Sequence, residues 1–253
     1  MRVNNVVTKM NAGEMAYGAN LSFPSTTMIE LSGRVGFDFV TFDSEHGPFT
    51  VDILDDLCRV ADMAGLTPMA RVPDIEHPTI LRFLDRGIMG VTGPHITDGE
   101  RAQKLADACR YTPRGKRSFG SGRGAYFGDF ESGSDYMSHT NDNILVIAQL
   151  EDIQVLDNLD DILSVEGIDL FTSGGDECVR YEVAITGVTW GVLAASLIGK
   201  GVGTPIAYAD SATGDINSNP LGAHMVDACA IYLLVKEGNG TSIEDVRRVA
   251  GSL

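Results

Sequence analysis

The 253-residue sequence is poor in cysteine and in long apolar runs. Its four cysteines, Cys58, Cys109, Cys178 and Cys229, form no Cys-x-x-Cys pair, which argues against a disulfide framework or a zinc knot. No apolar stretch approaches the ~20 residues of a membrane span. Residues 1–18 lack the apolar core of a secretory signal. We therefore expect buried thiols, a cytoplasmic location and no membrane partner.

Positive charge is also scarce. The chain has 19 Lys and Arg residues against 35 Asp and Glu residues, and its formal net charge is −16. Such a surface repels nucleic-acid phosphates and anionic lipids, so we expect no nucleic-acid partner. It also repels anionic substrates, and a site that binds a carboxylate must therefore supply its own Arg or metal ion.

Apolar residues make up 43% of the chain, which is enough to fill a core. Short apolar runs typical of strands alternate with segments of helical periodicity. The predicted strands are residues 16–21, 37–42, 67–72, 87–93, 144–150, 168–173, 203–209 and 228–235. The predicted helices are residues 25–35, 51–65, 77–87, 98–111, 153–165, 188–201 and 242–253. This alternation indicates βαβ units, and eight strands in ~250 residues predict a single-domain (β/α)8 TIM barrel over residues 1–253.

One segment interrupts the alternation. Residues 112–143 are rich in Gly, Ser and charge and show no sustained period. A connection of this length in a compact domain is usually either functional or disordered. We interpret it as a flexible cover loop near the site, with simple disorder as the alternative.

The active site of such a barrel is built at the carboxyl ends of the strands. Candidate residues gather at or just beyond the ends of the second, third, fifth and sixth predicted strands. The candidates are Asp43, Ser44, Glu45, His46, Arg71, Gln149, Glu151, Ser173, Gly175 and Asp176. Other histidines are interpreted as structural, although His95 differs from them because it follows the fourth predicted strand.

Glu151 and Asp176 follow neighbouring predicted strands. Two carboxylates at adjacent strand ends suit a hard divalent cation such as Mg²⁺ or Mn²⁺, and Co²⁺ is a third option. The Gly-rich turn that contains Ser173 and Gly175 could present backbone N–H groups to a substrate carboxylate. The sequence therefore predicts a metal site with an adjoining carboxylate pocket.

His46 and Arg71 are the candidates for the chemistry itself. Asp43 or Glu45 could hydrogen-bond the His46 imidazole and raise its basicity, as a general base requires. The planar guanidinium of Arg71 matches a carboxylate or an enolate. No Lys follows a predicted strand in the inner site, so a Schiff-base mechanism is disfavoured.

Several blocks of sequence resemble a known family. They are FDFVTFDSEHGPF, MARVPDIEHPTILRFLDRG, YTPRGKRSFGSGRGAYFG, IAQLEDIQVLDNLDDILSVEGID and SGGDE. Together they are similar, in order, to the HpcH/HpaI family of class II pyruvate aldolases. The resemblance implies a metal-dependent aldolase that cleaves or forms a 4-hydroxy-2-oxo acid from pyruvate and an aldehyde through a metal-stabilised enolate.

The resemblance also implies roles for single residues. Glu151 and Asp176 would hold the cation, Arg71 would contact the keto or enolate oxygen, and Gln149 would line the pyruvate pocket. His46, paired with Asp43, would handle the proton. The resemblance further implies that Asp85 lies near the site, in some family members that of a neighbouring subunit, and that the protein is a homo-oligomer, hexameric or built from dimers.

The chain departs from the family pattern around the second metal acid, where it reads SGGDEC instead of GPADLS. His95 also stands where the family often has an apolar residue. Two alternatives therefore remain open. One is a citrate-lyase-like or malyl-CoA-like lyase, or a decarboxylase, of the same superfamily. The other is a non-catalytic protein that binds a 2-oxo acid.

Overall fold

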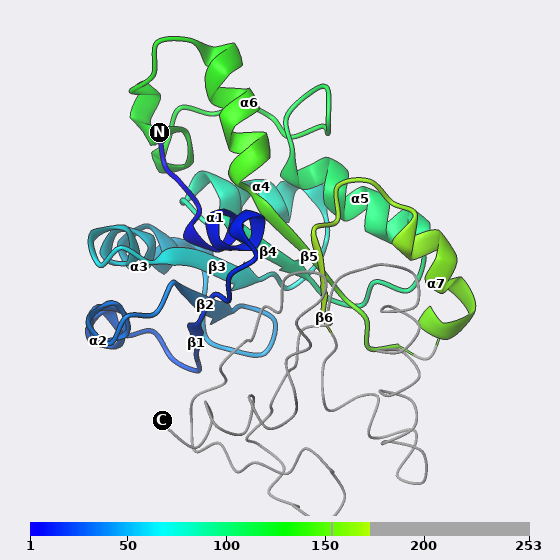
Figure 1. The fold of residues 1–253 in the computed structure, drawn as a ribbon, viewed down its shortest axis with the longest axis horizontal. Helices are drawn as coiled ribbons and strands as arrows, with labels where there is room; N and C mark the ends of the chain where they lie inside the picture. The colour runs from blue at the N-terminus through cyan, green and yellow to red at the C-terminus, as the bar shows by residue number, and fades with distance from the viewer. Residues whose placement is uncertain (153, 173–253) are drawn as a thin grey trace, which may run out of the picture.

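The computed structural model describes residues 1–152 and 154–172. It contains a curled sheet of six strands, all parallel and hydrogen-bonded in chain order (Figure 1). The strands are β1 (Gly18–Leu21), β2 (Phe39–Asp43), β3 (Thr67–Arg71), β4 (Gly90–Gly93), β5 (Leu145–Gln149) and β6 (Leu170–Thr172). Five of them lie within the predicted strands, and β2 extends one residue beyond the predicted range of 37–42, so the prediction of a parallel α/β fold is confirmed.

Helices connect the strands and pack against the outer face of the sheet (Figure 1). Five of them coincide with predicted helices: α2 (Thr26–Arg34), α3 (Val51–Met63), α4 (His77–Asp85), α5 (Gly99–Cys109) and α7 (Val155–Leu163). The predicted strands at 203–209 and 228–235 and the predicted helices at 188–201 and 242–253 lie outside the described residues. The described part is thus a series of βαβ units that accounts for six of the eight expected strands.

Alternating residues of each strand face opposite sides of the sheet. Val40 and Ala70 belong to the large core cluster under the helices, whereas Phe39, Met69 and Ile147 belong to a second cluster on the inner face. Side chains two or four residues further along the same strands face the same side, which places Asp43, Arg71 and Gln149 on this inner face as well. The inner face is therefore apolar at the amino-terminal edge and polar at the carboxyl-terminal edge.

A helix that the sequence analysis did not predict, α1 (Asn5–Ala12), packs against the amino-terminal edge of the sheet. The buried Asn4 side chain accepts hydrogen bonds from the backbone N–H groups of Val6 and Val7. Its Nδ2 atom donates to the carbonyl oxygens of Met89 at 2.9 Å and Asn143 at 3.0 Å. One side chain thus both begins the helix and attaches it to the residues that precede β4 and β5.

The segment 112–143 contains regular structure that its sequence did not predict: the 3₁₀ helix η1 (Arg123–Gly128) and helix α6 (Gly133–Asn143). Helix α6 buries only Tyr136 and Asn141, so its apolar stripe is too sparse to produce a helical period. It leads directly into β5 and lies at the end of the sheet where that strand begins (Figure 1). Within one chain, α6 therefore lies at the edge opposite the predicted site.

A buried ion pair positions β6 beside β5. Arg110, at the end of α5, is 1% exposed, and its Nη2 atom lies 2.9 and 2.8 Å from the two carboxylate oxygens of Asp169. Asp169 also accepts the backbone N–H of Val146 at 2.6 Å. Burial raises the pKa of Asp169, although Arg110 opposes this effect. The pair anchors the chain immediately before β6, so that β6 enters the sheet in register.

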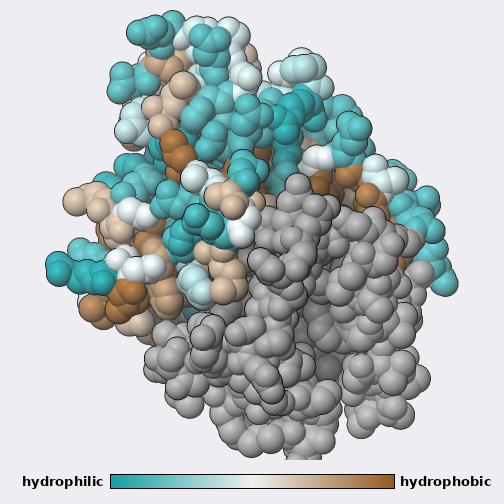
Figure 2. Space-filling view, viewed as in Figure 1, coloured by the Kyte–Doolittle hydropathy of each residue, from teal (hydrophilic) through white to brown (hydrophobic). Residues whose placement is uncertain are grey.

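Figure 2 shows hydrophilic side chains over most of the visible described surface, with hydrophobic ones gathered in smaller areas. Exposed apolar side chains on or next to α2 include Met28, Leu31 and Val35. None of the helices in the described ranges combines the length and the apolar character needed to cross a membrane.

Candidate functional site

Asp43 and Arg71 end the neighbouring strands β2 and β3 and are paired in the parallel register. The Arg71 guanidinium donates from Nε to Asp43 Oδ1 at 2.9 Å and from Nη2 to Oδ2 at 2.5 Å. Burial by itself would raise the pKa of Asp43, but the hydrogen bonds and charge of Arg71 outweigh it, and the pKa lies below its ordinary value. The pair holds Arg71 in one orientation at the polar edge of the inner face.

Glu45 lies two residues beyond β2, and its side chain is 10% exposed. Its Oε2 atom is 3.2 Å from Nη1 of Arg71. Burial and the neighbouring Glu151 carboxylate raise the pKa of Glu45, while the charge of Arg71 opposes the shift. The turn itself is held by Asp43, whose Oδ1 accepts the backbone N–H of Glu45 at 3.1 Å.

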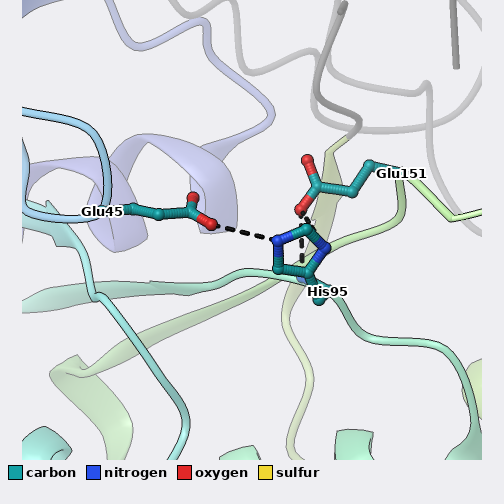
Figure 3. Close-up of side chains that lie close together, drawn as sticks. All are labelled: Glu45, His95 and Glu151. Atoms are coloured by element: carbon teal, nitrogen blue, oxygen red, sulfur yellow. Dashed lines mark hydrogen bonds and ion pairs between the residues drawn. The ribbon is translucent and has the colours of Figure 1, made fainter. Parts of the chain in front are cut away.

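His95 follows β4 and lies between two glutamates (Figure 3). Its Nε2 atom is 3.2 Å from Oε1 of Glu45, and its Nδ1 atom is 3.3 Å from Oε1 of Glu151 and 3.1 Å from Oδ2 of Asp152. Burial lowers the pKa of His95, but the three surrounding carboxylates outweigh it and raise the pKa above its ordinary value. The imidazole therefore occupies a strongly negative environment.

Gln149 and Glu151 come from the end of β5. The buried Gln149 side chain donates from Nε2 to Oε2 of Glu151 at 2.5 Å, and the backbone N–H of His95 donates to Oε1 at 3.0 Å. The Glu151 side chain is 6% exposed. Two donors thus fix the orientation of a carboxylate that has been removed from water.

Glu45, His95 and Glu151 can each offer a ligand atom such that all three atoms lie within 4.8 Å of one another. Buried carboxylates are unfavourable unless they are paired with positive charge or bind a cation. The residues present therefore fit a divalent cation, with carboxylate oxygens and an imidazole nitrogen as available ligands.

His46, another predicted site residue, lies at the edge of this cluster. The His46 side chain is 71% exposed, and its Nε2 atom lies 4.0 Å from Oε2 of Glu45. The expected hydrogen bond between the His46 imidazole and Asp43 is not formed. The Asp43 carboxylate bonds the Arg71 guanidinium, and from His46 it accepts the backbone N–H, at 3.3 Å, and not the imidazole. The bidentate fit of a carboxylate to a guanidinium explains this preference.

Asp85 ends helix α4, on the connection that leads back to the start of β4. Its carboxylate lies 3.6 Å from Nη2 of Arg117, in the 112–143 segment. It is therefore not part of the cluster at the carboxyl-terminal edge of its own chain. Ser173, Gly175 and Asp176 lie outside the described residues.

Sequence reasoning did not assign Glu45 and His95 to a metal site. Both residues follow predicted strands, and this position at a strand end was the one feature of the sequence that could have indicated a role in the site. What the sequence could not supply was the direction of each side chain within its loop.

The family model described as HpcH/HpaI aldolase/citrate lyase matches residues 19–181, more than half of the sequence. The chain therefore belongs to the HpcH/HpaI aldolase/citrate lyase family.

Two relatives and one solved structure illustrate the similarity. The chain is 32% identical over 167 residues to a hydroxypyruvate/pyruvate aldolase of Rhizorhabdus wittichii, covering 66% of this chain and 65% of the relative. It is 35% identical over 164 residues to a 2-keto-3-deoxy-L-rhamnonate aldolase of Escherichia coli, covering 64% and 60%. The matched region is thus less than two thirds of either relative. The crystal structure of an HpcH/HpaI aldolase from Desulfitobacterium hafniense superimposes with a TM-score of 0.73 at 23% identity, covering 81% of this chain and 82% of that one, so the two share a fold.

Proposed function

We propose that the protein is a metal-dependent pyruvate aldolase, a carbon–carbon lyase that cleaves or forms a 4-hydroxy-2-oxo acid from pyruvate and an aldehyde. The observation that carries this proposal is the inward-facing Arg71, held by Asp43 beside the buried Glu45–His95–Glu151 cluster. Family membership and the names of the two aldolase relatives support it.

The proposal includes a closed (β/α)8 barrel over residues 1–253, completed by the predicted strands at 203–209 and 228–235. It also includes Asp176 as a second carboxylate ligand beside Glu151. Thr172, the last residue of β6, pairs with Gln149 of β5, so the chain leaves β6 next to the site. The following turn, with Ser173 and Gly175, is proposed to bind the substrate carboxylate through backbone N–H groups.

Each polar residue of the site has a proposed task. A bound divalent cation, Mg²⁺, Mn²⁺ or Co²⁺, would supply the Lewis acidity that makes the methyl protons of a 2-oxo acid acidic. Arg71 donates to the keto oxygen and stabilises the negative charge that develops there. Asp43 positions Arg71, Gln149 lines the pyruvate pocket, and the accessible His46 imidazole moves the proton through a water molecule.

The quaternary arrangement is part of the same proposal. Because Asp85 lies away from the cluster of its own chain, its proposed role is at the site of a neighbouring subunit in a homo-oligomer, hexameric or dimer-based. The exposed apolar side chains Met28, Leu31 and Val35 support an oligomer, since such groups are commonly buried between subunits. We propose a cytoplasmic location.

Deuterium exchange tests the proposal without knowledge of the aldehyde. Metal-stripped protein is incubated with pyruvate in D₂O, and NMR follows the methyl signal with and without Mg²⁺ or Mn²⁺. We expect metal-dependent exchange in the natural protein. Arg71→Ala should slow it by about 100-fold or more, as loss of a donor to a developing oxyanion does.

Arg59→Ala is the matched control, because Arg59 pairs with Asp56 on the exposed face of α3. It should exchange at the natural rate. Unchanged exchange in Arg71→Ala would overturn the role of this guanidinium. No exchange with any metal would overturn the aldolase proposal.

A lyase acting on a CoA thioester is the second candidate, because the family description includes citrate lyase as well as aldolase. It predicts that acyl-CoA esters bind to the metal-loaded protein and are cleaved. Titration calorimetry with acetyl-CoA, in parallel with pyruvate, separates the two. Pyruvate binding without turnover of any aldehyde would instead indicate a non-catalytic 2-oxo-acid binder.

A further inference from the structure

We propose that His95 is a nitrogen ligand of the cation, which it binds together with Glu45 and Glu151. This inference rests on the metal dependence in the proposed function and goes beyond it. It changes the site from an all-oxygen site into a mixed nitrogen and oxygen site. It therefore also concerns which cation the protein selects.

The distances in the cluster suit a shared cation. His95 Nε2 is 3.2 Å from Glu45 Oε1. Ligand atoms at ~2.1 Å from an octahedral cation are about 3.0 Å from adjacent ligand atoms and about 4.2 Å from the opposite one. One ligand atom from each of the three side chains lies within 4.8 Å of the other two, so small side-chain rotations bring them around one cation.

The backbone at His95 is arranged to present the side chain. Its φ is +53°, in the left-handed region that non-glycine residues seldom adopt. In this conformation its N–H donates to Glu151 Oε1 at 3.0 Å, and its carbonyl accepts from Nε of Arg101 at 2.7 Å. The backbone N–H and the imidazole of His95 therefore both contact the Glu151 carboxylate.

Asp152 supplies the usual partner of a metal-bound imidazole. Its Oδ2 atom is 3.1 Å from His95 Nδ1. A carboxylate that accepts the Nδ1 proton fixes the tautomer and leaves Nε2 as the ligating atom, which faces Glu45.

The buried carboxylates of Glu45 and Glu151 also favour a bound cation. Arg71 is already engaged by Asp43 through two hydrogen bonds. The same guanidinium also lies 3.2 Å from Oε2 of Glu45, so one positive charge is shared between two carboxylates, and this Oε2 atom accepts no hydrogen bond from the residues that the structure describes. A divalent cation between Glu45 and Glu151 would neutralise both carboxylates.

An imidazole ligand changes the order of preference among cations. An imidazole ligand favours the later divalent metals, and affinity rises from Mn²⁺ through Co²⁺ to Ni²⁺, whereas Mg²⁺ prefers oxygen ligands. Replacing His95 should therefore weaken Co²⁺ binding by about 10–100-fold, the range seen when groups around a metal are altered. Mg²⁺ binding should change much less.

The test is electron spin-echo spectroscopy of the full chain loaded with Mn²⁺, prepared with ¹⁴N and with ¹⁵N histidine. His95→Asn is the informative variant, because Asn tolerates positive φ and brings no imidazole. His77→Asn is the control, since His77 begins α4 and bonds the carbonyl of Lys116 away from the cluster. Calorimetry with Co²⁺ and Mg²⁺ accompanies the spectra.

We expect a histidine-nitrogen coupling to Mn²⁺ in the natural protein and in His77→Asn, and its loss in His95→Asn. Tight Mn²⁺ binding without that coupling, or with a coupling that survives in His95→Asn, would overturn the ligand role and leave the aldolase proposal standing. Absence of Mn²⁺ binding together with absence of pyruvate exchange would overturn both.

Discussion

Asp43 organises the polar edge of the inner face because it bonds two neighbours at once. It accepts the Arg71 guanidinium and the backbone N–H groups of the turn that carries Glu45. A single carboxylate therefore positions both the proposed substrate donor and one proposed ligand. In this arrangement the Asp43 carboxylate supports the Arg71 guanidinium, and its proposed role is to position that group.

The lowered pKa of Asp43 predicts a defined pH dependence of stability. Because the folded pKa lies below the unfolded value of about 3.9, the Asp43–Arg71 pair stabilises the fold at neutral pH. This contribution is lost as the pH falls through the folded pKa. Asp43→Asn should lower the free energy of unfolding at pH 7 by about 1.5–3 kcal/mol, the contribution of charged hydrogen bonds.

Urea unfolding between pH 3 and pH 7 measures this contribution. The difference between the natural protein and Asp43→Asn should shrink in the acid range. Asp56→Asn, which removes an exposed pair with Arg59, should change stability by less than about 1 kcal/mol. A constant difference at every pH would contradict the role of the Asp43 charge.

Helix α1 illustrates how an element depends on one buried side chain. Its apolar residues pack against the inner face at the amino-terminal edge, but Asn4 provides its attachment. The helix therefore closes the edge opposite the polar site and keeps Phe39 and Met69 from water.

Asn4→Ala should lower the free energy of unfolding by at least about 2 kcal/mol, since it removes a cap and leaves buried carbonyl groups unpaired. Ser25→Ala is the comparison, because Ser25 caps α2 with a single bond at an exposed position. It should cost about 1 kcal/mol or less. Equal losses in the two variants, measured by urea unfolding, would show that the Asn4 contacts to Met89 and Asn143 add nothing.

Over the whole molecule, the charge distribution explains why a cation matters. The net charge of −16 disfavours both the close approach of the buried acids and the binding of an anionic 2-oxo acid. In the proposed function, a cation bound at the cluster would join the Arg71 guanidinium in providing local positive charge inside an acidic protein.

Cation binding should therefore stabilise the whole fold. Mn²⁺ at about 100 times its Kd should add about 2.7 kcal/mol to the free energy of unfolding. For a chain of this size that corresponds to an increase in Tm of roughly 5–10 °C. EDTA should reverse it, and Glu151→Gln should abolish it. A thermal scan in which Glu151→Gln shows the same increase as the natural protein would place the bound cation elsewhere.

The sequence predicted local structure well where the periodicity was strong. Strands β1 to β6 and helices α2, α3, α4, α5 and α7 follow from alternating or helical apolar patterns. It did not predict α1 and α6, because each buries too few residues to produce a clear period. Their positions depend on contacts with distant parts of the chain, such as those of Asn4 and Tyr136.

For the site, the sequence by itself determined that Asp43, Arg71 and Gln149 lie at the carboxyl ends of parallel strands, because each comes at or just after the end of a short apolar run typical of a strand. Only the tertiary structure decided how these groups pair. Asp43 bonds Arg71 and not the His46 imidazole, since the guanidinium offers two parallel donors. His95 lies between Glu45 and Glu151 because the loops after β2, β4 and β5 meet at the carboxyl-terminal edge of the curled sheet, and loop direction depends on packing that no local pattern encodes.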